Sequence, residues 1–267
     1  MDALTPYLEH QPVFSPAALR RFVVSGHAVG WLEAVTVDFL LAQVPGFTLA
    51  GNTLQLPLSG DACSALLGRA ALAMQDAGLI RGWRNERYAC HAPAADASPD
   101  LQQVLFTLER AAFRRFGLTS RAVHINGYTH DGRLWVGRRA PGKSIDPDRL
   151  DNLAAGGLPV GEAITDCVIR ELWEEAGVPA ALASHAQPSG VLRTTRNEVD
   201  GTHDEIIYTF DLALPDDFTP HNTDGEVAGF KLMTAEQAIA ALADFTWDAG
   251  LVTAQFLRRQ GWASGQP

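Results

Sequence analysis

The chain has 267 residues, of which 46% are hydrophobic and 19% are charged, and its formal net charge is −10. This length suits two domains, or one domain with a large extension, and the hydrophobic content excludes a largely disordered protein. The negative charge disfavours a nucleic acid partner, and no run of about eighteen apolar residues predicts a membrane span.

The ends and the cysteines give two further expectations. The N-terminus has no basic stretch followed by an apolar segment, so no secretory signal is predicted and we expect a cytoplasmic protein. The three cysteines, Cys63, Cys90 and Cys167, are widely spaced and form no Cys-x-x-Cys pair. This argues against a disulfide framework or a zinc site and predicts buried free thiols.

The first third of the chain is predicted to alternate helices and strands. Ser15-Pro16 is a favourable helix start, and the apolar residues after it recur at helical spacing, so a helix is predicted to begin there. A second helix is predicted over 66–79, where Gly78 gives the stop. Short alternating runs predict strands over 53–58 and 83–91.

A boundary between two domains is predicted near residue 118. The segment 91–99 is rich in turn-forming residues and predicts a linker. An apolar stripe over 100–116, followed by Gly117, predicts a helix. The sequence pattern then changes, which divides the chain into an N-terminal α+β domain, 1–117, and a second domain, 118–267.

The second domain begins with a hairpin signal. The apolar runs 122–128 and 134–137 flank a turn that contains Asp131-Gly132. The remaining elements are predicted from hydrophobic periodicity. They are strands over 190–192, 205–212 and 227–232, and helices over 234–242 and 247–260.

The segment 156–178 carries the candidate chemistry. Glycine and proline in 156–161 predict a tight loop, and the helix that follows is predicted to end at Gly177. Glu171, Glu174 and Glu175 stand at positions i, i+3 and i+4 of that helix and share one face. Three like charges on one face need compensation, which a hard divalent cation such as Mg²⁺ supplies. The alternative is a solvated acidic face without a ligand.

The same segment fits the pattern G-x5-E-x7-R-E-U-x-E-E-x-G-U at every specified position, U being a bulky apolar residue. It thereby resembles the Nudix box. The resemblance implies an α/β fold, the Nudix α/β/α sandwich with a mixed sheet, preceded in this chain by the small α+β domain. It also implies Mg²⁺-dependent hydrolysis of a diphosphate linkage in a small organic molecule, with Mn²⁺ as the alternative ion.

Metal ligands follow from the resemblance, position by position. The box glutamates are implied to bind the metal, with one glutamate earlier in the box as a supporting ligand and one backbone carbonyl before it. The ligands so implied are Glu171, Glu175, Glu174, Glu162 and the carbonyl of Ala155.

The resemblance also implies a mechanism. Water attacks one phosphorus of the diphosphate, while the metal lowers the pKa of the water and neutralises charge on the phosphoryl oxygens. A carboxylate takes the proton, and the candidates are Glu174 and Glu226. Arg170 is implied to hold a box glutamate in place. Together with Glu171, these residues form the predicted catalytic set.

Segments outside the box refine the resemblance. The segments 123–128, 134–139, 150–157 and 222–227, together with 29–31 and 82–88 in the first domain, are similar to the Nudix subgroup related to the hydrolase domain of fungal thiamine pyrophosphokinase fusions. This implies hydrolysis of thiamine diphosphate or its oxidised analogues to the monophosphate. The N-terminal domain is expected to help build the pocket for the two rings.

Basic residues that flank the predicted cleft are candidates for substrate binding, namely Arg138, Arg139, Lys143 and Arg193. His124 and Asn126 alternate on a predicted strand, and we expect them to be hydrogen-bonded structural groups.

Two alternatives stay open for the function. One is a different Nudix substrate, such as ADP-ribose or a nucleotide sugar, and the other is a ligand sensor without turnover. Isopentenyl diphosphate isomerase shares the Nudix fold but uses a catalytic cysteine upstream of the box. This alternative is set aside because Cys63 and Cys90 lie outside the second domain. The expected partner is a small-molecule diphosphate. The sequence leaves the oligomeric state open, a homodimer included.

Overall fold

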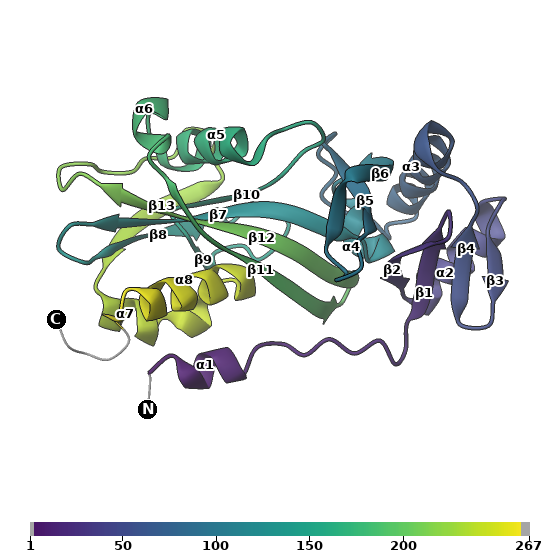
Figure 1. Cartoon of the computed structure of the whole chain (residues 1–267), viewed down its shortest axis with the longest axis horizontal. Helices are drawn as coiled ribbons and strands as arrows, with labels where there is room; N and C mark the ends of the chain where they lie inside the picture. Colours follow the sequence, from purple (N-terminus) through teal and green to yellow (C-terminus); the bar gives the residue numbers. More distant parts are fainter. Residues whose placement is uncertain (1–2, 263–267) are drawn as a thin grey trace.

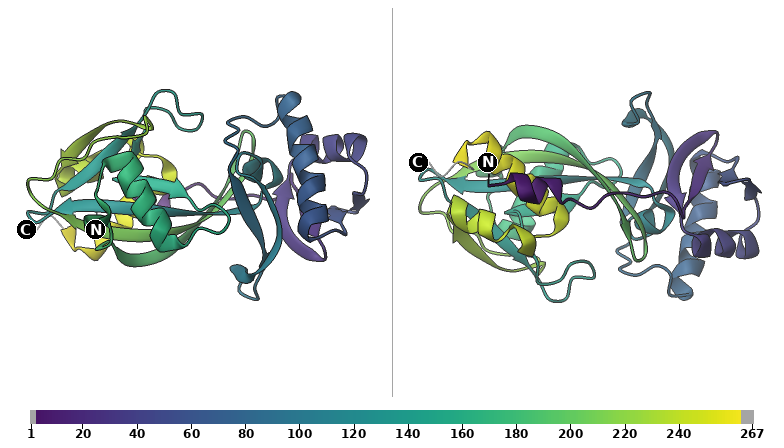
Figure 2. Two further views of the ribbon diagram at one scale, coloured as in Figure 1. Left: turned by 90° about the horizontal axis from the view of Figure 1, so that it is seen from above. Right: turned by 90° about the horizontal axis from the view of Figure 1, so that it is seen from below.

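The computed structural model describes residues 3–262 and shows an α/β chain with two lobes side by side (Figure 1). Figure 2 shows the same two lobes from above and below. The strands of the N-terminal lobe are β1 (Arg20–Val24), β2 (His27–Leu32), β3 (Thr48–Ala50), β4 (Thr53–Leu56), β5 (Arg87–Pro93) and β6 (Pro99–Glu109). Its helices are α2 (Ala34–Gln43), α3 (Gly60–Asp76) and α4 (Ala112–Phe116). The strands form a four-stranded sheet, β2-β1-β4-β3, and a two-stranded hairpin, β5-β6.

The C-terminal lobe is built on a seven-stranded mixed sheet. Its strands are β7 (Thr119–Thr129), β8 (Leu134–Arg139), β9 (Leu150–Asp151), β10 (Ala154–Gly157), β11 (Gln187–Glu198), β12 (Gly201–Leu214) and β13 (Val227–Met233). The order is β11-β12-β7-β8-β13, with β10 paired to β7 and β9 to β8. Strands β7 and β12 run parallel, whereas the other pairs in this sheet are antiparallel.

Helices cover both faces of this sheet. They are α5 (Ile164–Ala176), α6 (Ala180–Ala183), α7 (Ala235–Ala240), a 3₁₀ turn over Leu242–Asp244, and α8 (Trp247–Arg259). Helix α5 lies on one face, and α7 and α8 lie on the other (Figure 1). The predicted α/β/α sandwich with a mixed sheet is therefore confirmed. None of the described helices combines the length and the apolar character needed to cross a membrane.

The first described helix, α1 (Thr5–Glu9), packs on the C-terminal lobe before the chain crosses to the other lobe (Figure 1). Its Tyr7 stacks on Trp247 of α8, with ring centroids 6.3 Å apart. Leu4, just before this helix, is fully buried in the cluster that also contains α8 residues. The N-terminal segment thus spans both lobes.

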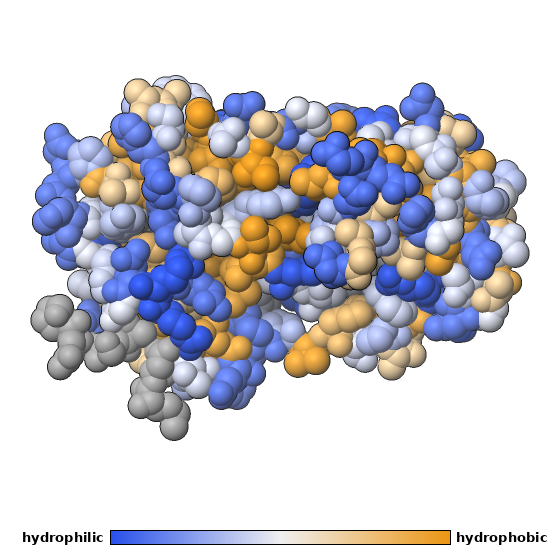
Figure 3. Space-filling view, in the orientation of Figure 1, coloured by the Kyte–Doolittle hydropathy of each residue, from blue (hydrophilic) through white to orange (hydrophobic). Residues whose placement is uncertain are grey.

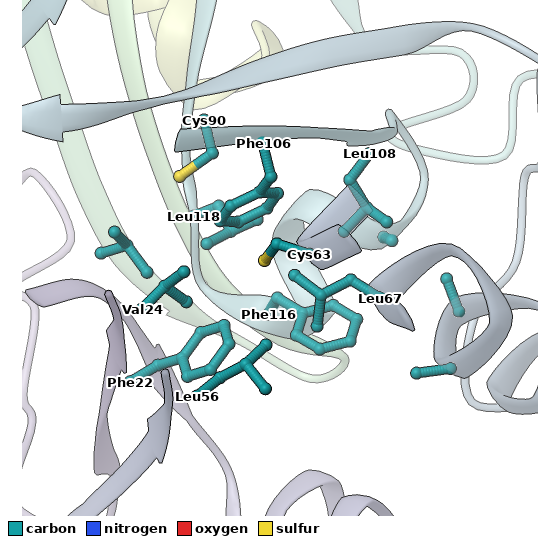
Figure 4. Packing of buried hydrophobic residues seen from close by; sticks show 14 of the residues in the cluster. Phe22, Val24, Leu56, Cys63, Leu67, Cys90, Phe106, Leu108, Phe116 and Leu118 are labelled. Carbon is teal, nitrogen blue, oxygen red and sulfur yellow. The ribbon is translucent and has the colours of Figure 1, made fainter. Parts of the chain in front are cut away.

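The two lobes have separate hydrophobic cores. The cluster of the N-terminal lobe includes the fully buried Phe22, Phe106 and Phe116, with the thiols of Cys63 and Cys90 among them (Figure 4). In the other lobe, one cluster lies under α5 and another under α7 and α8. Burial raises the pKa of the Cys63 thiol to about 12. All three cysteines are buried and free, as predicted.

Most of the elements predicted for the C-terminal lobe are confirmed. The hairpin around Asp131-Gly132 is β7-β8, and the later strands and helices are present with shifted ends. In the N-terminal lobe, α3 confirms the helix predicted over 66–79, although it begins earlier, and β4 and β5 overlap the two predicted strands. On the face seen in Figure 3, hydrophobic side chains form patches separated by hydrophilic ones.

The helix predicted to begin at Ser15-Pro16 is wrong. Residues Arg20–Val24 form β1 instead, in which Phe22 and Val24 are buried and Val23 between them is partly exposed. Ser25 and Gly26 both have positive φ, 49° and 83°, which is the backbone of a tight hairpin turn into β2. The turn and the two-residue burial period override the helical spacing of the apolar residues.

The helix predicted over 100–116 is also wrong for most of its length. Pro99–Glu109 form β6, which pairs antiparallel with β5, so the predicted linker 91–99 contains the turn of a hairpin and the ends of its two strands. Only the last part of the prediction is helical, as α4. The β-branched and aromatic residues of β6 suit a strand, and the partner strand decides between the two readings.

Gly117 occupies the point where α4 ends and the chain enters β7. Its φ is +56°, and a Cβ built there would lie 2.1 Å from the carbonyl oxygen of Trp31. We expect Gly117→Ala to lower the free energy of unfolding by about 2 kcal/mol or more, because the left-handed backbone and the contact both resist a side chain. Urea denaturation followed by circular dichroism measures this.

A matched control separates the two causes. Gly26 has φ +83°, and a Cβ added there would have no atom within 4 Å, so Gly26→Ala carries the cost of the backbone alone. Equal losses in the two variants would show that the contact with Trp31 has no energetic effect.

Candidate active site

Helix α5 positions the box residues. It follows the tight loop, ends at Gly177 with φ +64°, and buries Val168, Leu172 and Ala176 toward the sheet. Glu171 and Glu175 lie on the same buried side, at 8% and 6% exposure, whereas Glu174 is more accessible. The helix therefore carries two carboxylates into a place where an unpaired charge is costly.

Glu175 is joined directly to strand β10. Its Oε2 accepts a hydrogen bond of 2.8 Å from the backbone N–H of Ala155. Because the N–H and C=O groups of one strand residue point to the same edge, the carbonyl of Ala155 is directed toward the same side. Burial, followed by the charges of Glu171 and Asp151, raises the pKa of Glu175 to about 8.

Arg170 connects the other box glutamates. Its Nε and Nη2 each donate to Glu162 at 2.8 Å, and its Nη1 donates to Glu171 at 2.6 Å and to Glu174 at 3.0 Å. The two bonds from Arg170 to Glu162 lower the pKa of Glu162. Burial raises the pKa of Glu171, although Arg170 acts in the opposite direction. One guanidinium thus orients three carboxylates and compensates only part of their charge.

Gly156 leaves the space that the Glu171 carboxylate occupies. A Cβ at this position would lie 1.9 Å from Oε1 of Glu171 and 2.4 Å from Oε2. The strand therefore passes close to the carboxylate only because residue 156 has no side chain. The glycine at the start of the box has a steric role at the site itself.

These residues fit a divalent metal. Two buried carboxylates with raised pKa values, a carbonyl directed to the same side and a close glycine strand give an oxygen-rich site with excess negative charge. Hard cations such as Mg²⁺ are bound by this donor set. Glu171, Glu175 and Ala155 would hold the metal, with Glu174 and Glu162 beside them.

A cleft of about 790 Å³ opens beside the box, and both lobes line it. From the C-terminal lobe come box residues and residues of the sheet. From the N-terminal lobe come polar and aromatic side chains that sequence reasoning did not single out: Arg81, Arg84, Glu86, Tyr88, Arg110 and Phe113. The cleft is therefore a joint product of the two lobes.

Asp151 on β9 adds another carboxylate to the box side of the cleft. It is 9% exposed and accepts a hydrogen bond of 2.8 Å from Nη1 of Arg139. Arg139, one of the predicted substrate-binding residues, therefore reaches the cleft but is engaged by a carboxylate. Asp151 is close enough to Glu175 to contribute to its raised pKa.

Glu226, just before β13, lies in the cleft between two cations. Arg84 of the N-terminal lobe donates to its Oε1 at 2.9 Å, and Lys143 forms an ion pair with its Oε2. The predicted residues Lys143 and Glu226 are thus brought together, and Arg84 joins them from the other lobe. Which carboxylate takes the proton of water stays a prediction.

Tyr88 of β5 brings the N-terminal lobe against the strand before the box. It is 4% exposed, and a Cβ on Gly157 would lie 1.4 Å from its hydroxyl oxygen. Arg110 lies over its ring at 5.8 Å from the centroid. Among the described residues the hydroxyl has no hydrogen-bond partner, and burial raises its pKa, so it stays protonated.

The structure does not bring two of the predicted substrate-binding residues to this cleft. Arg138 is exposed, with Nε 3.8 Å from Oδ1 of Asp148. Arg193 pairs with both oxygens of Asp204, at 2.9 and 2.8 Å, and lines a separate cavity of about 350 Å³. Strand position decides this placement, because it directs each side chain away from the box.

His124 and Asn126 are hydrogen-bonded as expected. Nδ1 of His124 lies 2.8 Å from Oδ1 of Asn152, whose amide nitrogen donates to Oδ1 of Asn126 and to Oγ1 of Thr253. Since that nitrogen donates, the Asn152 oxygen is the acceptor and His124 carries its proton on Nδ1. His124 also lines the cleft.

Sequence signals exist for some of the residues that the prediction misses. Tyr88 and Arg84 lie in the segment 82–88, and Asp151 lies in 150–157, two of the segments on which the proposed resemblance outside the box depends. Glu205 of β12 also lines the cleft. Nothing in the sequence pattern points to Arg110 or Glu205.

Models of known families match both parts of the chain. The family model for the NUDIX domain matches residues 118–256, and the model of a domain of unknown function, DUF4743, matches residues 8–120. Nudix hydrolase 20, chloroplastic, of Arabidopsis thaliana is 38% identical over 259 residues, which cover 90% of this chain and 68% of that protein. Nudix hydrolase 24, chloroplastic, of the same organism is 38% identical over 194 residues, covering 69% and 50%.

The chain thus spans between half and about two thirds of the length of these relatives. Among solved structures, DR0079 from Deinococcus radiodurans is similar with a TM-score of 0.47 and 24% identity, covering 65% of this chain and 98% of that one.

Proposed function

The chain belongs to the Nudix hydrolase family, and on that premise we propose that it hydrolyses the diphosphate linkage of thiamine diphosphate or of its oxidised analogues to the monophosphate. The observation that carries the hydrolytic part is the buried pair Glu171 and Glu175: Glu175 accepts a hydrogen bond from Ala155, and Glu171 and Ala155 line the cleft. This arrangement suits the handling of phosphate oxygens together with a divalent metal.

The cationic side chains of the cleft support a diphosphate ligand. Arg84, Lys143 and Arg139 lie at the box end, and each is held there by a carboxylate. In the proposed complex their N–H groups bind the diphosphate oxygens, because charge-assisted bonds to phosphate are strong. When bound, Mg²⁺ would neutralise phosphoryl charge and lower the pKa of the attacking water.

Two carboxylates are placed to take the proton from water. Glu174 is 39% exposed at its side chain and has one arginine partner, so it is accessible from the cleft. Glu226 is held between Arg84 and Lys143, whose ion pairs fix its position. We assign the proton transfer to Glu174 and a positioning role to Glu226.

The size and the lining of the cleft support an organic group beyond the diphosphate. A volume of about 790 Å³ falls in the range of small-molecule sites. Tyr88 and Phe113 of the N-terminal lobe, with ring centroids 5.4 Å apart, give an aromatic wall. Both rings come from the lobe that is similar to the domain of unknown function, so we propose that this lobe selects the substrate.

A substrate panel tests the proposal. The purified chain is incubated with Mg²⁺ and thiamine diphosphate, oxythiamine diphosphate, ADP-ribose and a nucleotide sugar, and the products are separated by chromatography. We expect thiamine-type diphosphates to give the monophosphate and phosphate at the highest kcat/KM. A higher kcat/KM for ADP-ribose or the nucleotide sugar would contradict the thiamine-type substrate but not the hydrolase activity. The absence of product from every compound would refute the hydrolase activity.

A further inference from the structure

We infer that Glu205 selects the substrate by pairing with a positively charged or amino-bearing ring of its organic group. This inference deepens the proposed function and rests on it for the position of the diphosphate. The observations that carry it are the partners of Glu205, the charge balance around it and its place on the floor of the cleft.

Glu205 is a cleft carboxylate that forms no ion-pair contact among the described residues. It lies on β12, lines the cleft and is half-buried. Its Oε1 accepts a hydrogen bond of 2.8 Å from the hydroxyl of Ser120, and no ion pair joins it to an arginine or lysine among residues 3–262. By contrast, Glu86, Glu226 and Asp151 each have an arginine partner.

Negative charge is in excess at this end of the cleft. Asp248 and Glu198 pair with Arg196, at 2.8 and 2.7 Å. The charge of Glu205 acts on Arg110, but the guanidinium of Arg110 pairs with Glu86, at 3.0 Å. His203 contacts Asp248 at 3.2 Å. A cationic ligand would offset this negative charge, and a ligand N–H group would give Glu205 a second hydrogen-bond donor beside Ser120.

A metal ion is a poor candidate for the same place. The ligand atoms of His203, Glu205 and Asp248 all lie within 4.8 Å of one another. However, both oxygens of Asp248 are engaged by Arg196, at 2.8 and 3.0 Å, and Oδ1 also accepts from Thr194. These contacts occupy the carboxylate lone pairs that a metal would need, whereas a ring that pairs with Glu205 does not use them.

The floor of the cleft leads from the box to Glu205. Ser120, Ala122 and His124 alternate along β7, so their side chains share the face of the sheet that lines the cleft. Ala155 pairs with His124 and Glu205 pairs with Ser120, four residues further back. This distance is about 13 Å along a strand. An extended diphosphate with one or two rings can therefore reach from the box to Glu205.

The hydroxyl of Tyr88 gives a further, independent observation. Its side chain covers the floor at Gly157, between the box and Glu205, and its buried hydroxyl lacks a partner among the described residues. Buried hydroxyls are normally hydrogen-bonded. A ring bound on this floor would lie beside Tyr88, with Glu205 at its far end and His124 nearer the box.

The test compares Glu205→Gln with the wild type in the hydrolysis of two diphosphates and in the binding of thiamine. The diphosphates are thiamine diphosphate, whose ring is cationic, and 2-phenylethyl diphosphate, whose ring has no nitrogen. We expect the variant to raise KM for thiamine diphosphate ~10-fold with little change in kcat, and to leave both constants for 2-phenylethyl diphosphate unchanged, because only one charge-assisted contact is lost. Glu9→Gln, at an exposed glutamate of α1, is the matched control.

Binding of thiamine itself, measured by calorimetry, tests the inference without turnover. We expect its Kd to rise ~10-fold in Glu205→Gln and to stay unchanged in Glu9→Gln. If the wild type binds thiamine with this dependence but hydrolyses neither diphosphate, the proposed function fails and the inference holds. An unchanged Kd in Glu205→Gln, no binding to the wild type, or an equal loss on both diphosphates would each overturn the inference. Thermal unfolding checks that the variant is folded.

Discussion

Replacing Glu175 by Gln is expected to lower kcat by at least ~10²-fold while the fold stays intact. The amide keeps the shape of the side chain, and its oxygen can still accept the hydrogen bond from Ala155. The amide cannot ionise, whereas Glu175, whose pKa is raised to about 8, can lose its proton to bind a cation beside Glu171. The loss therefore falls on the step that would need the metal.

Initial rates with thiamine diphosphate at saturating Mg²⁺ measure this effect, and Glu9→Gln serves as the control for the same chemical change at an exposed position. Circular dichroism and thermal unfolding establish that the variant is folded. A folded variant with a rate close to that of the wild type would mean that Glu175 does not hold the metal.

Gly156→Ala is expected to lower kcat/KM by ~10²-fold, although no charged group is changed. The added methyl group would lie 1.9 Å from Oε1 of Glu171, so the carboxylate or the strand must move. Since Arg170 ties Glu171 to Glu162 and Glu174, a displacement of one carboxylate disturbs the others. The binding of Mn²⁺, followed by calorimetry, is expected to weaken in parallel.

Gly142→Ala provides the comparison. Gly142 lies in the loop between β8 and β9, and a Cβ there has no atom within 4 Å. We expect this variant to keep the activity and the metal affinity of the wild type. If Gly156→Ala also keeps both, the close contact between β10 and the Glu171 carboxylate has no role at the site.

Sequence reasoning found the part of the site that is local in the chain. The tight loop, the helix and the spacing of Glu171, Glu174 and Glu175 are all encoded within one segment, so a helical period is enough to place the carboxylates on one face. The same reasoning failed for β1 and β6, where helical spacing of apolar residues competed with hairpin pairing. Whether such a segment forms a helix or a strand depends on the strand it can pair with, and that partner lies outside the short stretch in which periodicity is judged.

The part of the site that sequence reasoning missed depends on contacts between distant residues. Arg84 reaches Glu226, which is 142 residues away in the chain, and Tyr88 meets Gly157 across the two lobes. Glu205 shares its cleft with residues of β5 and β7 because the parallel pairing of β7 and β12 places it there. Neither composition nor periodicity carries this information, because each contact depends on how the lobes pack.

The two lobes divide the proposed work between them. The C-terminal lobe supplies the carboxylates and the strand that would hold the metal, and the N-terminal lobe closes the cleft with Tyr88, Phe113 and Arg84. Variation in the N-terminal lobe is thus expected to change which diphosphate is bound, while the chemistry at the box stays the same.

The dependence of thiamine diphosphate hydrolysis on free Mg²⁺ tests the central claim most directly. The rate of phosphate release is followed as free Mg²⁺ is raised from zero, after treatment of the wild-type chain with EDTA. We predict no release above background without the metal and a saturable rise when Mg²⁺ is added back. A full rate in EDTA, or no release at any Mg²⁺ concentration, would contradict the account.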